Sequence, residues 1–436
     1  MTRLGELAER IESRQAEIGV VGLGYVGLPL AVAFADAGFR VLGVDLDADR
    51  VDHVNAGRSY LDDVPETEVA RLVSAGNLAA TTSMREMGRL DCIQVCVPTP
   101  LTRTKDPDVS HIVSVLEAIR RTLRSGQLVV LGSTTYPGTT SELFRPMLEE
   151  SGLQVGDDFA LAFAPERIDP GNHRYLLRQI PKVVGGDTEL CTKLAERLYL
   201  AVFDEVVTVS CSRTAEMVKL LENTFRMINI GLANEIAVIC ERLGIDVWEV
   251  TDAAATKPYG FMKFEPGPGL GGHCIPVDPN YLAWKLRSLN YTARFIELAS
   301  EINTSMPDWA CDRITKILNR DRLAVNGSRI LVLGVAYKAD VADTRESPAL
   351  EILERLRELQ ADVRYHDPLL AEVSTENANW KSVPLSDEEL QSADLVVITA
   401  AHRAVDYERV ARLAPRVFDT RNATRDLEDA PNVEKL

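Results

Sequence analysis

The sequence predicts an α/β protein with two Rossmann-like, doubly wound parallel-sheet domains joined by a helical middle that contains one long helix. Three observations predict this architecture. Short apolar runs alternate with helical periodicity before residue 205 and again after residue 320. A glycine-rich turn follows the first apolar run. Between the two alternating regions, residues 213–243 form an amphipathic stretch without proline. We therefore expect three domains, 1–205, 206–320 and 321–436.

The elements follow in chain order. A helix with apolar spacing is expected at 28–37, and the Gly/Pro-rich stretch 259–272 is expected to be a loop. After residue 329, Ser347 followed by Pro348 predicts a helix start, and another strand should reach Asp367. Apolar runs of strand length predict the remaining strands at 18–22, 41–44, 92–97, 128–131, 160–163, 330–333, 395–399 and 417–419.

Composition excludes several classes of function. The 65 Asp and Glu residues against 48 Lys and Arg give a net charge of -17, which would repel a phosphate backbone, so no nucleic-acid partner is expected. No apolar run approaches the roughly 20 residues of a membrane span, so no membrane partner is expected either. The first 17 residues lack the apolar core of a signal peptide. The 7 cysteines form no CxxC pair, which is typical of a reducing compartment, and we expect a cytoplasmic protein whose cysteines pack in its core, Cys274 excepted.

Gly22, Gly24 and Gly27 stand between a predicted strand and a predicted helix. In that context the first glycine permits a tight turn, the second lets a pyrophosphate approach the backbone, and the third lets the helix pack on the strand. Asp45 ends the second strand, where its carboxylate can accept hydrogen bonds from a ribose and would repel a 2′-phosphate. The residues therefore predict NAD as the cofactor; a purely structural glycine turn is the alternative.

Other candidates are ambiguous when taken singly. Cys274 follows the Gly/Pro loop and precedes Asp278 by four residues, so its thiol could attack an aldehyde, and a packing cysteine is the alternative. Lys219 and Asn223 share one helical face and could meet one substrate oxygen, although a solvated lysine beside a packing asparagine is favoured on these two residues alone. Two further candidates, Thr134 and Glu166, each follow a strand, at the sheet edge where such folds bind ligands and where turn residues are also common.

These motifs in this order resemble the UDP-sugar 6-dehydrogenases, in the UDP-glucose/GDP-mannose dehydrogenase superfamily, over residues 18–422. The resemblance rests on the motifs above and on the segments 97–100, 132–134, 165–167, 271–278, 334–338 and 343–348. It implies an NAD domain, a helical middle that forms a homodimer or higher homo-oligomer, and a C-terminal domain that holds the UDP group of the substrate.

The resemblance also implies a four-electron oxidation of the sugar C6 alcohol to a carboxylate, with two NAD and no metal. Cys274 would carry a thiohemiacetal and then a thioester, which a water positioned by Thr134 and a base at Asp278 would hydrolyse. Glu166 is a further acid/base candidate. Lys219, helped by Asn223, would stabilise negative charge on the C6 oxygen.

Residue by residue, the resemblance assigns further contacts. The cofactor-binding residues are Gly22, Gly24, Tyr25, Val26, Gly27, Asp45, Arg50, Pro98, Thr99, Thr134 and Arg345. The substrate-binding residues are Glu166, Arg167, Lys219, Asn223, Phe264, Gly271, Lys338 and Arg421. For the two cations Lys338 and Arg345, a surface salt bridge is the alternative.

Two segments indicate which sugar is oxidised. UDP-glucose dehydrogenases commonly carry a second glutamate four residues after the position of Glu166, where this chain has Pro170. Segments 165–171 and 266–276 look most like the branch that acts on UDP-N-acetylhexosamines. The resemblance thus implies UDP-N-acetylglucosamine, with UDP-N-acetylmannosamine and UDP-glucose as alternatives.

Two other functions compete. A non-catalytic protein that binds NAD and a UDP-sugar would be expected to lack the nucleophile or the lysine, whereas Cys274 and Lys219 are both present. A two-electron hydroxyacid or amino-acid dehydrogenase would not require a cysteine in the glycine loop, so replacement of Cys274 separates it from the four-electron enzyme.

Overall fold

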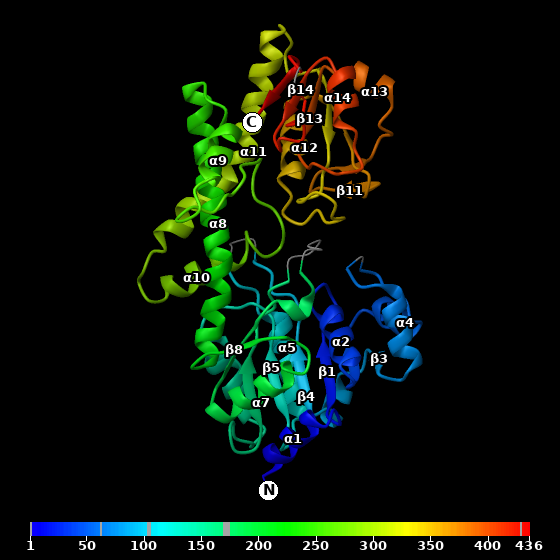
Figure 1. The fold of residues 1–436 in the computed structure, drawn as a ribbon, viewed down its shortest axis with the longest axis vertical. Helices are drawn as coiled ribbons and strands as arrows, with labels where there is room; N and C mark the ends of the chain where they lie inside the picture. Colours follow the sequence, from blue (N-terminus) through cyan, green and yellow to red (C-terminus); the bar gives the residue numbers. More distant parts are fainter. Residues whose placement is uncertain (1, 62, 103–105, 169–174, 428–429) are drawn as a thin grey trace. The chain divides into compact units, whose positions relative to one another are not determined.

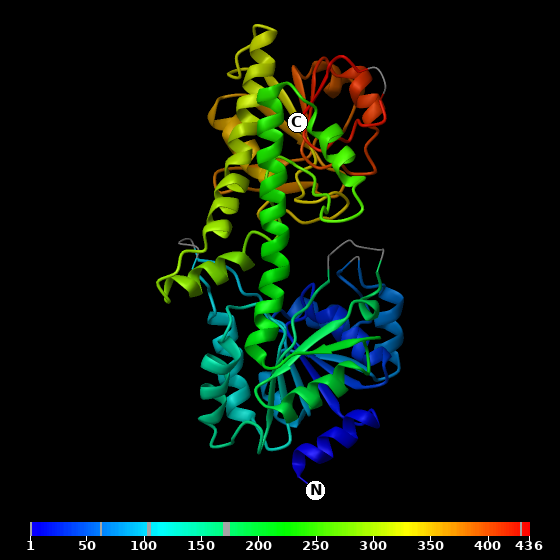
Figure 2. The ribbon, with the colours of Figure 1, turned by 60° about the vertical axis from the view of Figure 1, so that its left-hand side comes forward.

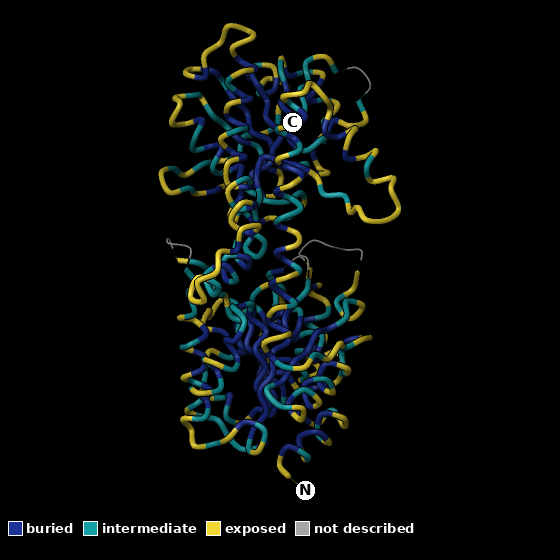
Figure 3. Tube along the Cα trace, turned by 90° about the vertical axis from the view of Figure 1, so that its left-hand side faces the viewer, coloured by how far each residue is buried: buried dark blue, intermediate teal, exposed yellow. Residues whose placement is uncertain are grey.

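The structure is a computed structural model that describes residues 2–61, 63–102, 106–168, 175–427 and 430–436. The chain divides into two compact units. The first comprises Met1–Glu222 and Asn280–Tyr291, and the second comprises Asn223–Pro279 and Thr292–Leu436. Each unit is built around a main sheet whose central strands are buried (Figure 3).

The first unit contains a sheet in the order β3-β2-β1-β4-β5-β6-β7-β8. Neighbouring strands are parallel except β6 and β7, which pair antiparallel. The order turns at β1 and β4, as in a doubly wound sheet, so the carboxyl ends of β1, β2, β4, β5 and β6 meet at one edge. The strands are β1 (Glu17–Val21), β2 (Arg40–Val44), β3 (Leu78–Thr81), β4 (Cys92–Val95), β5 (Leu128–Leu131), β6 (Ala160–Phe163), β7 (Lys182–Gly186) and β8 (Val206–Thr208).

Helices cover both faces of this sheet. Phe34 of α2 and Tyr199 of α7 lie with ring centroids 6.0 Å apart, so these two helices share a face. Figure 2 shows α5 and α6, in cyan, on the opposite face. The helical segments are α1 (Arg3–Glu12), α2 (Gly27–Asp36), α3 (Ala48–Asn55), α4 (Glu66–Ser74), η1 (Met84–Arg89), α5 (Ser110–Thr122), η2 (Thr140–Phe144), α6 (Arg145–Glu149), η3 (Leu177–Gln179) and α7 (Glu189–Tyr199).

The first 17 residues, whose role the sequence left open, belong to the first unit. Helix α1 buries Leu4, Leu7 and Ile11 against its core. Arg10 pairs with the buried carboxylate of Asp91 at 2.6 Å, which fixes the helix at the amino-terminal edge of the sheet.

The glycine turn after β1 shows why glycine is required at two of its three positions. Gly22 has φ +90°, and a Cβ there would lie 2.6 Å from the carbonyl oxygen of Cys96. A Cβ on Gly27 would collide with the carbonyl oxygen of Gly22. A Cβ on Gly24 would lie 4.0 Å from its nearest non-neighbouring atom, Arg50 Nη1. This position therefore leaves open the space that a pyrophosphate would need.

The predicted long helix is α8 (Ser212–Leu243). It continues from the first unit into the second, and Figure 1 traces it in green. The absence of proline and the apolar spacing explain its uninterrupted length. Helix α10 (Asp278–Arg287) likewise has residues in both units.

The second unit repeats the α/β design. Its main sheet is parallel, in the order β10-β9-β13-β14-β15, and a small antiparallel pair, β11 and β12, forms a second sheet beside β10. Ser347 Oγ accepts the N–H of Ala349 at 3.3 Å, so α12 begins at Pro348 as predicted. The elements are α9 (Val247–Ala255), α11 (Arg294–Arg320), β9 (Arg329–Leu333), α12 (Pro348–Glu358), β10 (Asp362–His366), β11 (Glu372–Ser374), β12 (Asn379–Lys381), α13 (Asp387–Ser392), β13 (Leu395–Ile398), α14 (Tyr407–Leu413), β14 (Val417–Asp419) and β15 (Val433–Lys435).

Three features differ from the sequence prediction. The β6–β7 pair is antiparallel in a sheet that is otherwise parallel, and β7 was not among the predicted strands. Helix α11, for which the sequence predicted no element, extends through Pro307, a residue that usually ends a helix. Cys211, interpreted as a packing residue, is half-exposed before α8, whereas the five other packing candidates are buried; none of the seven cysteines forms a disulfide within the described residues.

Candidate functional site

The glycine turn and Asp45 form one cradle at the carboxyl edge of the first sheet. Asp45 Oδ2 accepts the N–H of Leu23 at 2.7 Å, and Oδ1 accepts the N–H of Asp47 at 3.0 Å. Arg50 Nη1 lies 3.5 Å from the same carboxylate. The buried anion is thus held beside the turn, where it can accept hydroxyl hydrogen bonds from a ribose. Together with the open space at Gly24, these residues fit a dinucleotide.

Further side chains surround this cradle. Tyr60, which the sequence analysis missed, donates its hydroxyl to the carbonyl oxygen of Leu23 at 2.5 Å. The guanidinium of Arg50 lies 6.0 Å from the Tyr60 ring. Tyr25 has an exposed side chain, and Val26 caps the start of α2 with its backbone.

The segments after β4 and β5 are tied together. Thr99 Oγ1 donates to the carbonyl oxygen of Thr134 at 2.8 Å, and the Tyr281 hydroxyl donates to the carbonyl oxygen of Thr99 at 2.7 Å. Pro98 lies directly before this contact. Two residues predicted from separate motifs, Thr99 and Thr134, therefore lie side by side.

Glu166 follows β6 at the same edge of the sheet. Its Oε2 lies 3.0 Å from Lys182 Nζ, and its Oε1 accepts the N–H groups of Arg167 and Ile168 at 2.7 and 3.1 Å. Arg167 in turn pairs with Glu222 of α8 at 2.6 Å. Lys182 was missed because it reads as the polar first residue of an apolar strand. Pro170, which carried the substrate argument, lies outside the described residues.

Lys219 lies on α8, with a side chain that is 8 % exposed. Within the described part of the chain it makes neither a hydrogen bond nor an ion pair. One turn earlier, the fully buried Glu216 accepts the N–H groups of Gly138 and Thr140, at 2.5 and 2.8 Å, and the Thr140 hydroxyl at 2.6 Å. Burial raises the pKa of Glu216 to about 7. Glu216, not foreseen from the sequence, thus joins the helix of Lys219 to the segment that follows Thr134.

In the second unit, Cys274 lies in a tight turn. Its carbonyl oxygen accepts the N–H groups of Val277 and Asp278 at 3.2 and 2.8 Å, so the cysteine and the carboxylate belong to one turn at the start of α10. The amide of Asn223 donates to the Asp278 carboxylate, and both side chains are buried. Cys274 itself is half-buried. The structure therefore brings together three of the predicted residues: a thiol, a carboxylate and an amide.

Glycines let the Cys274 loop pass close to its neighbours. A Cβ on Gly271 would lie 2.7 Å from Tyr337 Cβ, so a larger residue would displace the loop. The N–H of Gly272 donates to the carbonyl oxygen of Arg345 at 3.0 Å. The Arg345 guanidinium forms a two-point pair with Asp343, with the closer nitrogen at 2.6 Å. Lys338 follows Tyr337 in the turn after β9 and is half-buried.

Arg421 and Phe264 lie near the beginning of this loop. Arg421 Nε donates to the carbonyl oxygen of Thr399 at 2.9 Å, and its guanidinium packs on Gly267, where a Cβ would collide with it. Burial lowers the pKa of Arg421 to about 10. Phe264 lies edge-on to Phe225 of α8, with centroids 5.9 Å apart.

The second unit contains a copy of the first unit's cradle. Gly334 has φ +82° after β9, and Asp367 Oδ2 accepts the N–H of Val335 at 2.8 Å, as Asp45 does for Leu23. In the copy, His402 Nε2 lies 3.2 Å from the same oxygen. Because His402 Nδ1 accepts the N–H of Asp340 at 3.0 Å, Nε2 carries the proton and donates it to Asp367. The oxygen that would accept a ribose hydroxyl is thus already occupied.

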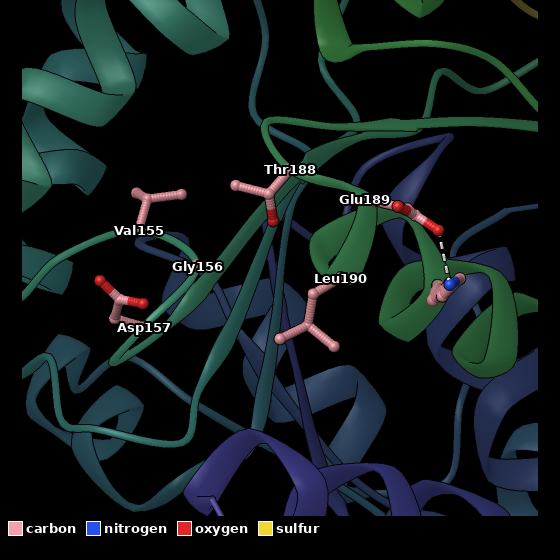
Figure 4. Close-up of a pocket in the computed structure, with 7 residues that line it drawn as sticks. Val155, Gly156, Asp157, Thr188, Glu189 and Leu190 are labelled. Atoms are coloured by element: carbon pink, nitrogen blue, oxygen red, sulfur yellow. Dashed lines mark hydrogen bonds and ion pairs between the residues drawn. The ribbon is translucent and has the colours of Figure 1, made fainter.

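A hollow of about 450 Å³ lies elsewhere in the first unit (Figure 4). It lies by the segment that precedes β6, whereas Glu166 follows β6, and Glu189 and Lys193 form an ion pair on its rim. None of the predicted site residues lines it. Its lining residues are Val155, Gly156, Asp157, Thr188, Glu189, Leu190 and Lys193.

Three family models match the chain in succession. The NAD binding domain of the UDP-glucose/GDP-mannose dehydrogenase family matches residues 16–203, its central domain matches 213–305, and its UDP binding domain matches 331–426. The chain belongs to the UDP-glucose/GDP-mannose dehydrogenase family.

Curated relatives in this family cover nearly the whole chain. The UDP-N-acetyl-D-glucosamine 6-dehydrogenase of Pseudomonas aeruginosa is 35% identical over 89% of this chain and 91% of its own length. The UDP-N-acetyl-D-mannosamine dehydrogenase of Pyrococcus horikoshii is 34% identical over 94% and 96%. An NDP-N-acetyl-D-galactosaminuronic acid dehydrogenase of Ralstonia solanacearum is 36% identical over 93% and 95%.

Solved structures of the family agree with the fold. The UDP-D-ManNAc dehydrogenase of Pyrococcus horikoshii matches with a TM-score of 0.87 and 33% identity, covering 96% of this chain and 98% of that one. A UDP-glucose dehydrogenase of Pyrobaculum islandicum matches with a TM-score of 0.84 and 28% identity, covering 96% of each chain.

The dehydrogenase family assignment confirms the predicted fold class, the NAD cofactor and the activity class. The protein is an NAD-dependent UDP-sugar dehydrogenase. The family's NAD binding domain coincides with the cradle at Gly22–Gly27 and Asp45, and its UDP binding domain coincides with the second sheet. In the part of the chain that the structure describes, no helix combines the length and apolarity of a membrane span. Within the same residues, no group of His, Cys, Asp or Glu could hold a metal ion.

Proposed function

We propose that this dehydrogenase converts UDP-N-acetylglucosamine into the corresponding uronate by oxidising C6 twice through Cys274. The balanced reaction takes one sugar alcohol, two NAD⁺ and one water to one carboxylate, two NADH and three protons. The observation that carries the proposal is the turn that joins Cys274 to Asp278, with Asp278 held by Asn223. A two-electron dehydrogenase has no use for a nucleophile in that turn.

In the first step, bound NAD supplies the hydride acceptor for oxidation of the C6 alcohol to the aldehyde, as it does again in the second oxidation. Lys219 stabilises the negative charge that develops on the C6 oxygen, and Asn223, one helical turn later, assists it. A buried ammonium without a protein partner among the described residues is preorganised for this role, because no ion pair must break first.

In the second step, the Cys274 thiolate adds to the aldehyde carbon and forms a thiohemiacetal, whose oxidation gives a thioester. The aldehyde therefore remains bound between the two oxidations. A water held by Thr134 then attacks the thioester carbon, with Asp278 as the base, and the thiolate leaves. Glu166 is a further acid/base group beside the sugar.

The preference for an N-acetylated sugar is supported by the loop motifs and by relatives named above, two of which are named for UDP-N-acetylhexosamines and one for an N-acetylgalactosaminuronic acid. We propose UDP-N-acetylglucosamine as the substrate, with UDP-N-acetylmannosamine as the second candidate. The test is to compare kcat/KM for these two sugars and UDP-glucose. The proposal predicts the highest value for UDP-N-acetylglucosamine, and a higher value for either other sugar contradicts it.

We also propose three domains, 1–205, 206–320 and 321–436, and an assembly of at least two chains. The assembly is supported by exposed apolar side chains on two helices of the second unit: Leu232 of α8 is 53% exposed, and Phe295 and Leu298 of α11 are 75% and 53% exposed. Seven cysteines that form no disulfide within the described residues are typical of a reducing compartment, which supports a cytoplasmic location.

A further inference from the structure

A buried ion pair joins the end of β6 to the start of β7. Lys182, the first residue of β7, is 2% exposed, and Glu166 is 7% exposed. Lys182 Nζ lies 3.0 Å from Glu166 Oε2, while Glu166 Oε1 accepts two backbone N–H groups of the segment that follows β6. Both carboxylate oxygens are therefore engaged, and the side chain is fixed in one orientation.

Beside Glu166, two aromatic rings contact the ammonium of Lys182 in cation–π geometry. The rings of Tyr199 and Phe203 lie 5.2 and 5.3 Å from Nζ. Removing an ammonium and a carboxylate from water costs more than a surface pair would, and a well-packed apolar pair is often as stable or more stable. Stability alone therefore does not explain why the chain has this pair here, which points to a positional role.

The segment held by the pair leads to the helix that carries Lys219. The guanidinium of Arg167 donates to the carbonyl oxygen of Pro181 at 2.6 Å, next to Lys182. It also pairs with Glu222, three residues after Lys219 on α8. The residues after β6 are thus fastened on one side to β7 and on the other side to α8.

We propose that Lys182 is a positioning residue for the oxidation and that it acts through Glu166. Its ammonium pairs with the Glu166 carboxylate and holds it in place. The carboxylate in turn fixes the backbone position of residues 166–168. Arg167, which pairs with Glu222, then fixes the position of this edge of the sheet relative to α8. All the hydrogen bonds that Glu166 makes within the described residues are accepted by its oxygens, so its carboxylate anchors this segment on both sides. This inference rests on the proposed contacts of Glu166 and Arg167 with the sugar.

The test is a double-mutant cycle with Lys182→Met, Glu166→Gln and the double variant, together with Lys182→Arg. The rates are measured with whichever UDP-sugar the wild type oxidises fastest. We expect Lys182→Met to lower kcat/KM for the sugar about 100-fold, as expected for misplaced catalytic groups, and to leave KM for NAD within about twofold. Lys182→Arg should restore most of the activity, and the double variant should match Glu166→Gln alone.

The exposed Lys193 of α7 provides the matched control. Its ammonium pairs with Glu189 at the surface, so Lys193→Met should behave as the wild type. If Lys182→Met does not fold, the double variant carries the test, because it leaves no buried charge unpaired. A double variant at least about tenfold below Glu166→Gln, or a Lys182→Met variant with lower thermal stability and normal kcat/KM, overturns the proposal.

Failure of the proposed function would look different. A wild type that prefers UDP-glucose would contradict the proposed substrate but leave the cycle measurable with UDP-glucose. A wild type that oxidises none of the three sugars would contradict the proposed function itself.

Discussion

At the scale of single residues, burial makes a charged side chain costly to the fold unless it has a partner. Lys219 is the clearest case, because its ammonium is buried and unpaired within the described residues. Such a group is costly to the fold and is retained where negative charge must be stabilised during a reaction.

Replacing Lys219 by Met should therefore separate activity from stability. We expect kcat to fall about 100- to 1,000-fold, because the charge that stabilises the C6 oxygen is lost. The free energy of unfolding should stay the same or rise, since a buried unpaired charge is removed. Steady-state kinetics and denaturant unfolding test this, and a parallel loss of both activity and stability would contradict it.

Glu216 should make stability depend on pH. Its pKa rises from 4.5 to about 7 on folding because burial disfavours the charged form. Between these values the folded state binds more protons than the unfolded state, so Glu216 contributes a loss of stability as the pH rises through this window. Glu216→Gln should be less stable than the wild type at pH 5, with a deficit that shrinks by pH 7.5.

Melting temperatures of both proteins across this pH range provide the measurement. A deficit that is constant from pH 5 to pH 7.5 would contradict the raised pKa. Because the amide nitrogen introduced by Glu216→Gln cannot accept the N–H of Gly138, some deficit should persist at every pH.

The site residues that belong to local motifs could be predicted from the sequence, whereas the residues that hold them in place could not. Asp45 and the glycine turn are recognisable because spacing along the chain determines their geometry. Lys182 and Glu216 are not, because each acts on a segment that is distant along the chain, and nothing beside them in the sequence shows that partner.

At the scale of elements, the glycines of the turn after β1 are required for different reasons. Gly27→Ala should disrupt the first unit, because the new Cβ would collide with the carbonyl oxygen of Gly22. Gly24→Ala should fold, because no atom lies closer than 4.0 Å to its Cβ. Its methyl group would instead obstruct the pyrophosphate.

We therefore expect Gly24→Ala to raise KM for NAD about tenfold or more and to leave the melting temperature within a few degrees. KM for the UDP-sugar is the internal control and should change little. Unchanged KM for NAD in a folded Gly24→Ala protein would show that the pyrophosphate does not approach this glycine.

Most strand positions could be predicted from apolar runs, since both faces of these parallel strands are buried. Strand β7 was not predicted, because it has only two apolar residues, which stand between a lysine and two glycines. Helix α11 was not assigned, and Pro307 within it illustrates that tertiary packing can keep a helix where local propensity disfavours it.

At the scale of the whole molecule, the repeated α/β design was predictable because both halves show the same alternation along the chain. The duplication extends to the cradles. In the second cradle, however, His402 donates a hydrogen bond to Asp367, a difference that only the folded chain reveals.

The exposed apolar side chains of α8 and α11 predict self-association. These helices pack closely in the second unit, where a Cβ on Gly231 would lie 3.2 Å from Ala299 Cβ. Phe295→Glu together with Leu298→Glu should shift the protein toward monomers, because charges would be buried in the interface. Light scattering after size-exclusion chromatography measures the mass.

Leu359→Glu, at an exposed apolar residue after α12, is the matched control and should leave the mass unchanged. A wild type that is monomeric at micromolar concentration would contradict the proposed assembly.

The most direct test of the four-electron oxidation through Cys274 is the number of NADH formed per UDP-N-acetylglucosamine when the sugar is limiting. The wild type should form two, and Cys211→Ala, which removes the other half-exposed thiol, should also form two. Cys274→Ala should not complete the second oxidation to the carboxylate. One NADH per sugar in the wild type, or two with full conversion to the uronate in Cys274→Ala, would contradict the account.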